Sequence, residues 1–336
     1  RDRLRSRGLG DVYKRQLKYS TNQIGLAQYG RTLNSIKRLE KYPLANKKID
    51  TIKTEELQTY LNSLKNLSNS MIEKAHQQLN QAFTIAMNKG YIVQNPMIDV
   101  VRPKSNKEDK VVRALTVEEQ QSFTNWLLDK PIDEFKYRNV YLLQMYTGLR
   151  VGEALALTIH DIDLKNKRLK IHRTLTTDEK GNIIMGNKTK TYSGKRTIPI
   201  PDFLYPFVVE QMQITDKQIN NDEKLLFKPN NSKYCRRSTI NNELKRILKQ
   251  ELNITDISSH SLRHTFGTRC IESGMAPVVV QRLMGHKDIT VTLNTYTSVL
   301  EQFKERELDK VNQYYLNENL IGTNLISEKN DNEKEI

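Results

Sequence analysis

Hydrophobic positions in the first third of the chain recur at spacings of three and four. One series is Leu26, Tyr29, Leu33, Ile36 and Leu39. A second series is Met71, Ala75, Leu79, Ala82, Phe83 and Ala86. This period is typical of amphipathic helices that turn one face toward a core. The pattern predicts a small helical domain over residues 17–104, built as a bundle of about four short helices.

The pattern changes in the second part of the chain. Thr116 with Glu119 forms a capping box, so a new helical domain is expected to begin there. The stretch RLKIHRTL from Arg168 alternates like a strand, a turn follows, and RTIPI from Arg196 forms another strand. Helical periodicity returns from about Ile240. We therefore expect a mainly α protein with a small antiparallel β-sheet inside its second domain.

Charge and composition set the domain boundaries. The charged, proline-containing stretch around 102–113 predicts a linker over residues 105–115, followed by a mixed α/β domain over 116–320. The polar tail 321–336 is expected to be disordered. Residues 1–16, RDRLRSRGLGDVYKRQ, have no initiator Met and resemble translated adapter sequence. We set them aside as a non-native or disordered segment, with a basic arm as the alternative.

A net charge of +15 and a pI near 9.5 indicate a polyanionic partner, most simply nucleic acid. The alternative is a basic surface without a partner. The two cysteines, Cys235 and Cys270, do not form a disulfide framework and fit a reducing cytosol. No apolar run is long enough to cross a bilayer, so we expect a cytoplasmic protein.

Residues suited to holding and attacking a phosphate gather in the last third of the chain. His260 and Arg263 share one helical face, and His286 and Tyr296 follow. Guanidinium donors match phosphate oxygens, and a tyrosine hydroxyl can act as the nucleophile. Upstream, Arg150 stands at a predicted helix start, where backbone donors favour an anion. We expect the arginines and imidazoles to lower the pKa of the Tyr296 phenol.

Two further positions have competing interpretations. Glu153 lies one turn after Arg150, where it either orients neighbouring groups or forms an ordinary surface ion pair. His260 and His264 have the spacing of a zinc-binding helix, but Ser261 stands where a zinc peptidase has Glu. No third ligand is obvious. We therefore expect neither a metal nor another cofactor, and a structural His264 bonded to a backbone carbonyl.

These residues together resemble the tyrosine recombinase (phage integrase) family, whose catalytic domain carries R, K, HxxR, H or W, and Y in that order. The matching residues are Arg150 in TGLR, Lys190 in TKTYSGKRTIPI, His260 and Arg263 in HSLR, His286 in LMGH, and Tyr296 in TLNTY. The resemblance runs from about Leu17 to about Tyr315. It implies that residues 17–104 form a helical, SAM-like core-binding domain and that residues 116–320 form the catalytic domain.

The resemblance also implies a role for each residue. Tyr296 would attack a DNA phosphodiester and form a 3′-phosphotyrosyl intermediate, while the two arginines and His286 would hold the phosphate. His260 would act as general base or donor. Lys190 would protonate the departing 5′ oxygen, with Lys188 as the alternative lysine.

The expected function is a site-specific DNA recombinase, the integrase of a prophage or conjugative transposon, which integrates and excises a mobile element. Its partners would be double-stranded DNA at attachment sites, three further copies of itself in a synaptic homotetramer, and DNA-bending accessory proteins. The apolar stripe after Tyr296 would dock on a neighbouring protomer or on its own domain; its members are Val299, Leu300, Phe303, Leu308 and Val311. The alternatives are a Xer-type chromosome resolvase, a type IB topoisomerase-like enzyme and a non-catalytic DNA-binding relative.

Specific DNA binding by this basic chain is expected to weaken steeply with salt. The logarithm of the association constant should fall by about 0.9 per phosphate contact for each tenfold rise in salt, because each contact releases counterions. Titrating the protein against its DNA site over a series of salt concentrations measures this slope. A flat response between low and moderate salt would contradict the phosphate-binding interpretation.

Overall fold

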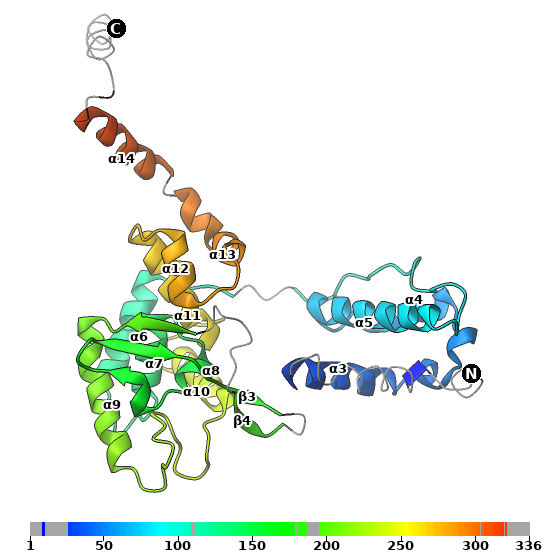
Figure 1. Ribbon diagram of the computed structural model, residues 1–336, viewed down its shortest axis with the longest axis horizontal. Coiled ribbons are helices and arrows are strands. Elements are labelled where there is room, and N and C mark those ends of the chain that lie inside the picture. The colour runs from blue at the N-terminus through cyan, green and yellow to red at the C-terminus, as the bar shows by residue number, and fades with distance from the viewer. Residues whose placement is uncertain are drawn as a thin grey trace, which may run out of the picture. The chain divides into compact units, whose positions relative to one another are not determined.

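The structure is a computed structural model that describes residues 9–10, 26–108, 112–178, 181–186, 195–302, 304–318 and 320. Its contacts divide the chain into two compact units (Figure 1). One unit takes the described residues of Arg1–Val111 and Leu175–Met185, and the other those of Val112–Thr174 and Gly186–Ile336.

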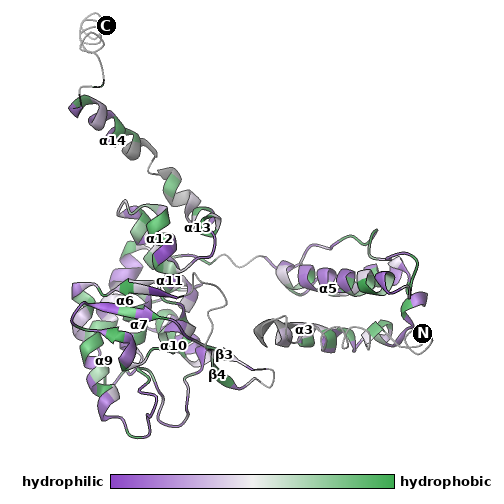
Figure 2. Ribbon diagram, viewed as in Figure 1, coloured by the Kyte–Doolittle hydropathy of each residue, from purple (hydrophilic) through white to green (hydrophobic). Residues whose placement is uncertain are grey.

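The first unit is helical, as the periodicity predicted. Its elements are α3 (Leu26–Leu39), two short 3-10 turns (Pro43–Asn46 and Ile49–Thr51), α4 (Thr54–Ser63) and α5 (Asn69–Asn88). Hydrophobic and hydrophilic residues alternate along α5 in Figure 2, and its buried side chains come from the predicted series. Met71 is the exception, since it is exposed and the neighbouring Ile72 takes the core position. The Gln78 side chain of α5 donates to Thr32 Oγ1 of α3, which ties the two helices together.

Leu9 belongs to this core although the sequence interpretation set residues 1–16 aside. It is fully buried, and its N–H donates to Lys47 O at 3.0 Å. Apart from Leu9 and Gly10, that segment lies outside the described residues, as does the tail 321–336.

The second unit begins with the predicted capping box. Glu119 N–H donates to Thr116 Oγ1 at 3.1 Å, and Thr116 N–H donates to Glu119 Oε2 at 2.9 Å. The helices that follow are α6 (Val117–Leu128), α7 (Arg138–Thr147), α8 (Val151–Ala154), α9 (Tyr205–Lys217), α10 (Arg237–Gln250), α11 (Ser259–Glu272), α12 (Pro277–Met284), α13 (Ile289–Gln302) and α14 (Lys304–Asn317). In the described residues, no helix is long and apolar enough to cross a membrane.

Helices α7 and α11 form the centre of this unit and pack directly on each other. Tyr141 of α7 is buried, and its hydroxyl donates to Ile240 O of α10 at 2.7 Å. From α11, Thr265 Oγ1 accepts from Leu115 N–H at 2.9 Å. Arg269 also reaches back and donates to Leu115 O. These bonds fix α11, which carries HSLR, against the start of its own domain.

The predicted strands form two sheets rather than the single sheet we expected. Antiparallel strands β1 (Ile162–Asp163), β2 (Arg168–Ile171) and β5 (Arg196–Pro199) make one, in the order β1-β2-β5. Strands β3 (Thr174–Thr177) and β4 (Ile183–Gly186) make the other. The stretch RLKIHRTL divides at His172 and Arg173, where both side chains contact the buried Asp161.

Candidate active site

Three guanidinium groups meet at the carboxyl end of α12. Arg196 Nε donates to Leu283 O at 2.7 Å, and Arg263 donates to Met284 O at 2.5 Å. Arg150 donates to Gly285 O at 3.1 Å. The last carbonyls of a helix have no partners within it and carry the negative end of its dipole, so cations stabilise them. The arginines therefore cap α12 and are drawn together by it.

Gly285 allows this cap to form. Its φ of +65° lies in the left-handed region, which glycine adopts without the cost that a side chain brings. Helix α12 ends there, and its last carbonyls are available to the arginines. His286 follows directly, so the same turn places the predicted histidine beside the cluster.

Glu153 is the counter-charge of the cluster. Its carboxylate accepts from Arg150 NH1 at 2.8 Å and from the Arg150 N–H at 3.0 Å, and Arg196 donates to both of its oxygens. The Glu153 side chain is 2% exposed. Burial alone would raise the pKa of Glu153, but the bonds and charges of Arg196 and Arg150 lower it to about 2. The carboxylate thus holds both the backbone and the side chain of Arg150 from inside the protein.

Arg196 was not among the predicted site residues. It begins the strand RTIPI, and its side chain is 7% exposed. A usable signal was present, because Arg196 alternates with Ile198, and alternate residues of a strand face the same side. An arginine on the buried side of a strand implies a buried carboxylate partner. Here that partner is Glu153.

The two predicted phosphate-binding arginines differ in exposure. The Arg150 side chain is 42% exposed, whereas Arg263 is 1% exposed and gives two of its N–H groups to Gly148 O and Met284 O. Burial and the charge of Arg150 lower the pKa of Arg263, though a guanidinium still keeps its proton. Arg150 is thus the more accessible of the two arginines. The short helix α8 adds little dipole there, so the expected helix-start contribution is small.

Arg263 nevertheless affects every histidine of the site. Burial lowers the pKa of His286 to about 4, and the Arg263 and Arg150 charges add to this effect. Partial desolvation and the same two charges lower the pKa of His260. Both rings are therefore neutral at pH 7, so each can donate through one ring nitrogen and accept through the other.

His286 is held by a residue that the sequence did not suggest. Its Nδ1 lies 2.8 Å from Oγ1 of Thr292, which is fully buried on α13. When the threonine hydroxyl donates to Nδ1, the ring proton sits on Nε2 and makes that nitrogen a donor. The two residues are six positions apart, which fits no regular periodicity, so this pair could not be predicted from the sequence.

We expected His264 to bond to a backbone carbonyl, but no such bond is present among the described residues. Its contacts among the described residues are ring contacts, edge-on to His260 at 4.8 Å and to Tyr296 at 6.1 Å. Burial, with His260 and Arg263 next in effect, lowers the pKa of His264 to about 4. His264 therefore packs as a neutral ring between the predicted base and the predicted nucleophile.

Tyr296 comes to this cluster, but in a closed position. It is 1% exposed, and its hydroxyl donates to Met284 Sδ at 3.4 Å. The expectation of a lowered phenol pKa is wrong for this arrangement. Burial raises the pKa of Tyr296 well above its usual value, and the opposing charge of Arg263 does not cancel that effect.

Lys190 and Lys188 both lie outside the described residues. In the part of the chain that is described, no three His, Cys, Asp or Glu side chains gather as a metal site would require.

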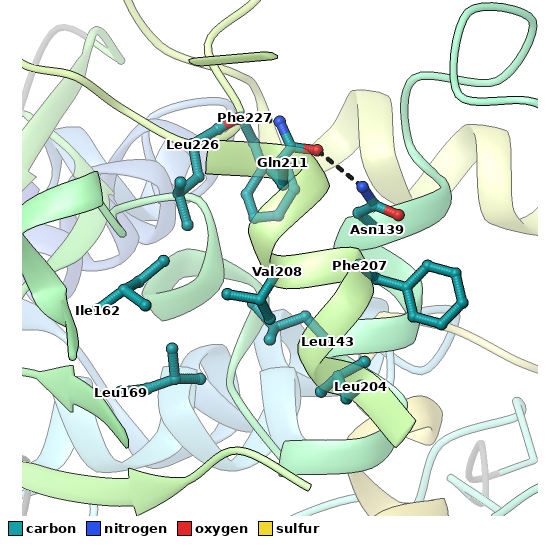
Figure 3. A pocket seen from close by; sticks show the side chains of 10 residues that line it. All are labelled: Asn139, Leu143, Ile162, Leu169, Leu204, Phe207, Val208, Gln211, Leu226 and Phe227. Atoms are coloured by element: carbon teal, nitrogen blue, oxygen red, sulfur yellow. Dashed lines mark hydrogen bonds between the residues drawn. The ribbon is translucent and has the colours of Figure 1, made fainter. Parts of the chain in front are cut away.

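An apolar cavity between α9 and the three-stranded sheet contains none of the predicted site residues (Figure 3). Its volume of about 10 Å³ admits at most one water.

Removing the Glu153 charge is expected to destabilise the protein. Glu153→Gln should lower the free energy of unfolding at pH 7 by about 3 kcal/mol, because a pKa near 2 rather than 4.5 records that much stabilisation of the carboxylate. The depressed pKa means that the stabilisation is full above pH 4.5 and is lost as pH falls toward 2. Urea unfolding at neutral and acidic pH measures both effects.

The matched control is Glu243→Gln, which breaks the more exposed ion pair with Arg246 and should cost less than about 1 kcal/mol. Equal losses in the two variants would refute the special role of Glu153. A difference in unfolding free energy between Glu153→Gln and the wild type that stays equally large in acid would also refute it.

Comparison with known proteins identifies the family of this chain. Residues 113–302 match the Phage integrase family, and residues 9–101 match the Phage integrase SAM-like domain. The chain is 28% identical to a Tyrosine recombinase XerC-like protein of Caldanaerobacter subterraneus subsp. tengcongensis, over 85% of this chain and 77% of that protein. It is also 28% identical to the transposase from transposon Tn916 of Enterococcus faecalis, over 84% and 72%.

Solved structures give the same result. The Tn1549 transposon integrase in complex with a circular intermediate DNA superimposes with a TM-score of 0.73 at 25% identity, over 87% of this chain and 95% of that one. A lambda integrase dimer bound to a core site shares the fold, with a TM-score of 0.64 at 18% identity. The chain belongs to the phage integrase family of tyrosine recombinases, enzymes that break and rejoin DNA.

Proposed function

We propose that this recombinase is the integrase of a mobile element and that Tyr296 is its nucleophile. The observation that carries the proposal is the gathering of Arg150, Arg263, His286 and Tyr296 at one end of α12. The Tn916 transposase and the Tn1549 integrase, both named for transposons, support a mobile element over a chromosome-resolving enzyme.

In the proposed reaction, Tyr296 Oη bonds to the phosphorus of a DNA phosphodiester while the bond to the 5′ oxygen breaks. The phenol proton passes to His260, and Lys190 gives a proton to the departing oxygen. A 5′-hydroxyl from the partner duplex then attacks the 3′-phosphotyrosyl bond and releases the tyrosine. One phosphodiester replaces another, so the exchange consumes no energy-rich cofactor.

The basic cluster fits this chemistry because negative charge grows on the phosphate oxygens in the transition state. Arg150 offers the exposed guanidinium, and the neutral His286, which directly follows the Gly285 carbonyl bonded to Arg150, offers a ring donor. Arg263 adds its positive charge from inside the protein, where it is buried. Loss of one preorganised donor such as Arg150 typically slows such a reaction by about 10²–10³.

We also propose that four copies of the chain assemble on two attachment-site duplexes in the bacterial cytosol, with DNA-bending proteins assisting. The two halves of the apolar stripe after Tyr296 differ. Leu300 packs against the core of its own unit, whereas Leu308, Val311 and Tyr315 lie on one side of α14 and are exposed. Figure 2 shows both hydrophilic and hydrophobic residues along α14. A second copy of this chain is the proposed occupant of that side.

The nucleophile is tested by Tyr296→Phe. In cells carrying element DNA, the wild-type protein should form SDS-resistant, protease-sensitive adducts at DNA 3′ ends, clustered at one sequence. The variant should bind the same DNA and form none, because the attacking oxygen is gone. Tyr314→Phe, on exposed α14, is the control and should keep full adduct yield.

Adducts that persist in Tyr296→Phe would exclude this tyrosine as the nucleophile. Wild-type adducts scattered without sequence preference would favour a topoisomerase-like activity. DNA binding without any adduct would favour a non-catalytic relative.

The role of α14 is tested by Leu308→Ser with Tyr315→Ser. Binding to a single DNA site should be unchanged, while four-protomer assembly on paired sites should fall at least about tenfold, since apolar anchors carry most interface energy. Sedimentation velocity on the protein–DNA mixtures measures both. Gln313→Ser with Asn317→Ser, on the opposite side of α14, is the matched control. Unchanged assembly in the apolar variant would refute docking through this helix.

A further inference from the structure

The Tyr296 hydroxyl lies where no DNA phosphate can reach it. The residue is 1% exposed and belongs to a core cluster with Cys270, Ile271, Val280 and Met284. In-line attack needs the oxygen and phosphorus to come within about 3–3.5 Å of each other. The position seen here therefore differs from the one that the reaction requires.

Gly267 makes this closed position sterically feasible. A methyl group placed on Gly267 would overlap the hydroxyl oxygen and Cζ of Tyr296, and would lie 3.0 Å from Met284 Sδ. The phenol thus rests directly on the backbone of α11, and any side chain at residue 267 would displace it. Gly267 sits two turns beyond His260, about 10 Å along the helix axis, so the hydroxyl lies away from the proposed base.

The backbone of α13 departs from helical geometry at the same residue. Tyr296 has φ −115° and ψ 17° inside an otherwise helical segment, which places a kink at the nucleophile itself. Rotation at this point can move the phenol while Thr292, one turn earlier, continues to hold His286.

We propose that Gly267 and Met284 form a resting seat for the nucleophile, from which Tyr296 must swing out before it can attack DNA. Gly267 is then a positioning residue for the reaction. The inference rests on the proposed role of Tyr296. In the seat the phenol is protonated, hydrogen-bonded to sulfur and closed to solvent, and outside it the phenol meets the charges of the arginine cluster.

The direct test is the chemical accessibility of Tyr296 in Gly267→Ala. Nitration by tetranitromethane, followed residue by residue with mass spectrometry, should be about tenfold or more faster at Tyr296 than in the wild type, because a packed core rejects an added methyl group. Buried Tyr141 and exposed Tyr314 serve as references within the same molecule. Thr268→Ala, at the adjoining position of α11, is the matched control and should leave nitration unchanged.

The effect of the seat on the reaction is measured as the rate at which the covalent protein–DNA product forms. The substrate is a nicked duplex that carries the sequence mapped from the wild-type adducts, because cleavage of such a duplex traps the covalent product. Gly267→Ala should form this product faster than the wild type when one protomer occupies the DNA. If nitration of Tyr296 is faster but the covalent product forms at the wild-type rate, the seat does not hold the tyrosine back from attack. If nitration is unchanged, Gly267 and Met284 do not form a seat for Tyr296.

Met284→Leu keeps the proposal testable if Gly267→Ala does not fold. Leucine has nearly the volume of methionine but leaves the buried hydroxyl without an acceptor. Nitration of Tyr296 should rise by a smaller factor, and no rise would count against the seat. If Tyr296→Phe still forms adducts, the nucleophile is assigned wrongly, while nitration still reports on the seat independently.

Discussion

The arrangement of the second unit depends on the carbonyls at the end of α12, which have no hydrogen-bond partners within the helix. Arginines that are far apart in the sequence reach these oxygens from α8, β5 and α11, and Glu153 balances their charge. Each of these like charges is costly to bury alone. Together with one buried carboxylate and a helix terminus, they form a stable cluster that fixes the relative positions of three elements. The proposed phosphate site is the exposed edge of that cluster.

The same constraint explains the contrast between the proposed catalytic groups. Arg150 extends from the edge of the cluster, while Arg263 and Tyr296 lie within it. A basic cluster completed by internal carbonyls does not need DNA in order to fold. In the proposed mechanism the arginines are preorganised, and Tyr296 is the group that has to move.

Much of this arrangement could be predicted from the sequence, because it follows from local pattern. Helical periodicity located α3 and α5, and the capping box located the start of α6. The motifs also placed Arg150, His260, Arg263, His286 and Tyr296 in one domain.

What could not be predicted depends on contacts between distant residues. The bond of His286 to Thr292, the pairing of Arg196 with Glu153 and the contact of Tyr296 with Gly267 all need the folded chain. The phenol pKa was predicted in the wrong direction for the same reason. Charge can be counted along a sequence, but burial depends on packing, and here burial has the larger effect.

The cap on α12 also limits how the length of this segment can vary among related chains. One residue inserted into Pro277–Met284 would rotate the last carbonyls by about 100° relative to the start of the helix. They would then point away from the three guanidiniums, and His286 would turn with them. By contrast, residues 231–233, between α9 and α10, are exposed, so the chain can gain or lose residues there at the surface. Insertions are therefore tolerable there and excluded from α12, whatever residues the helix carries.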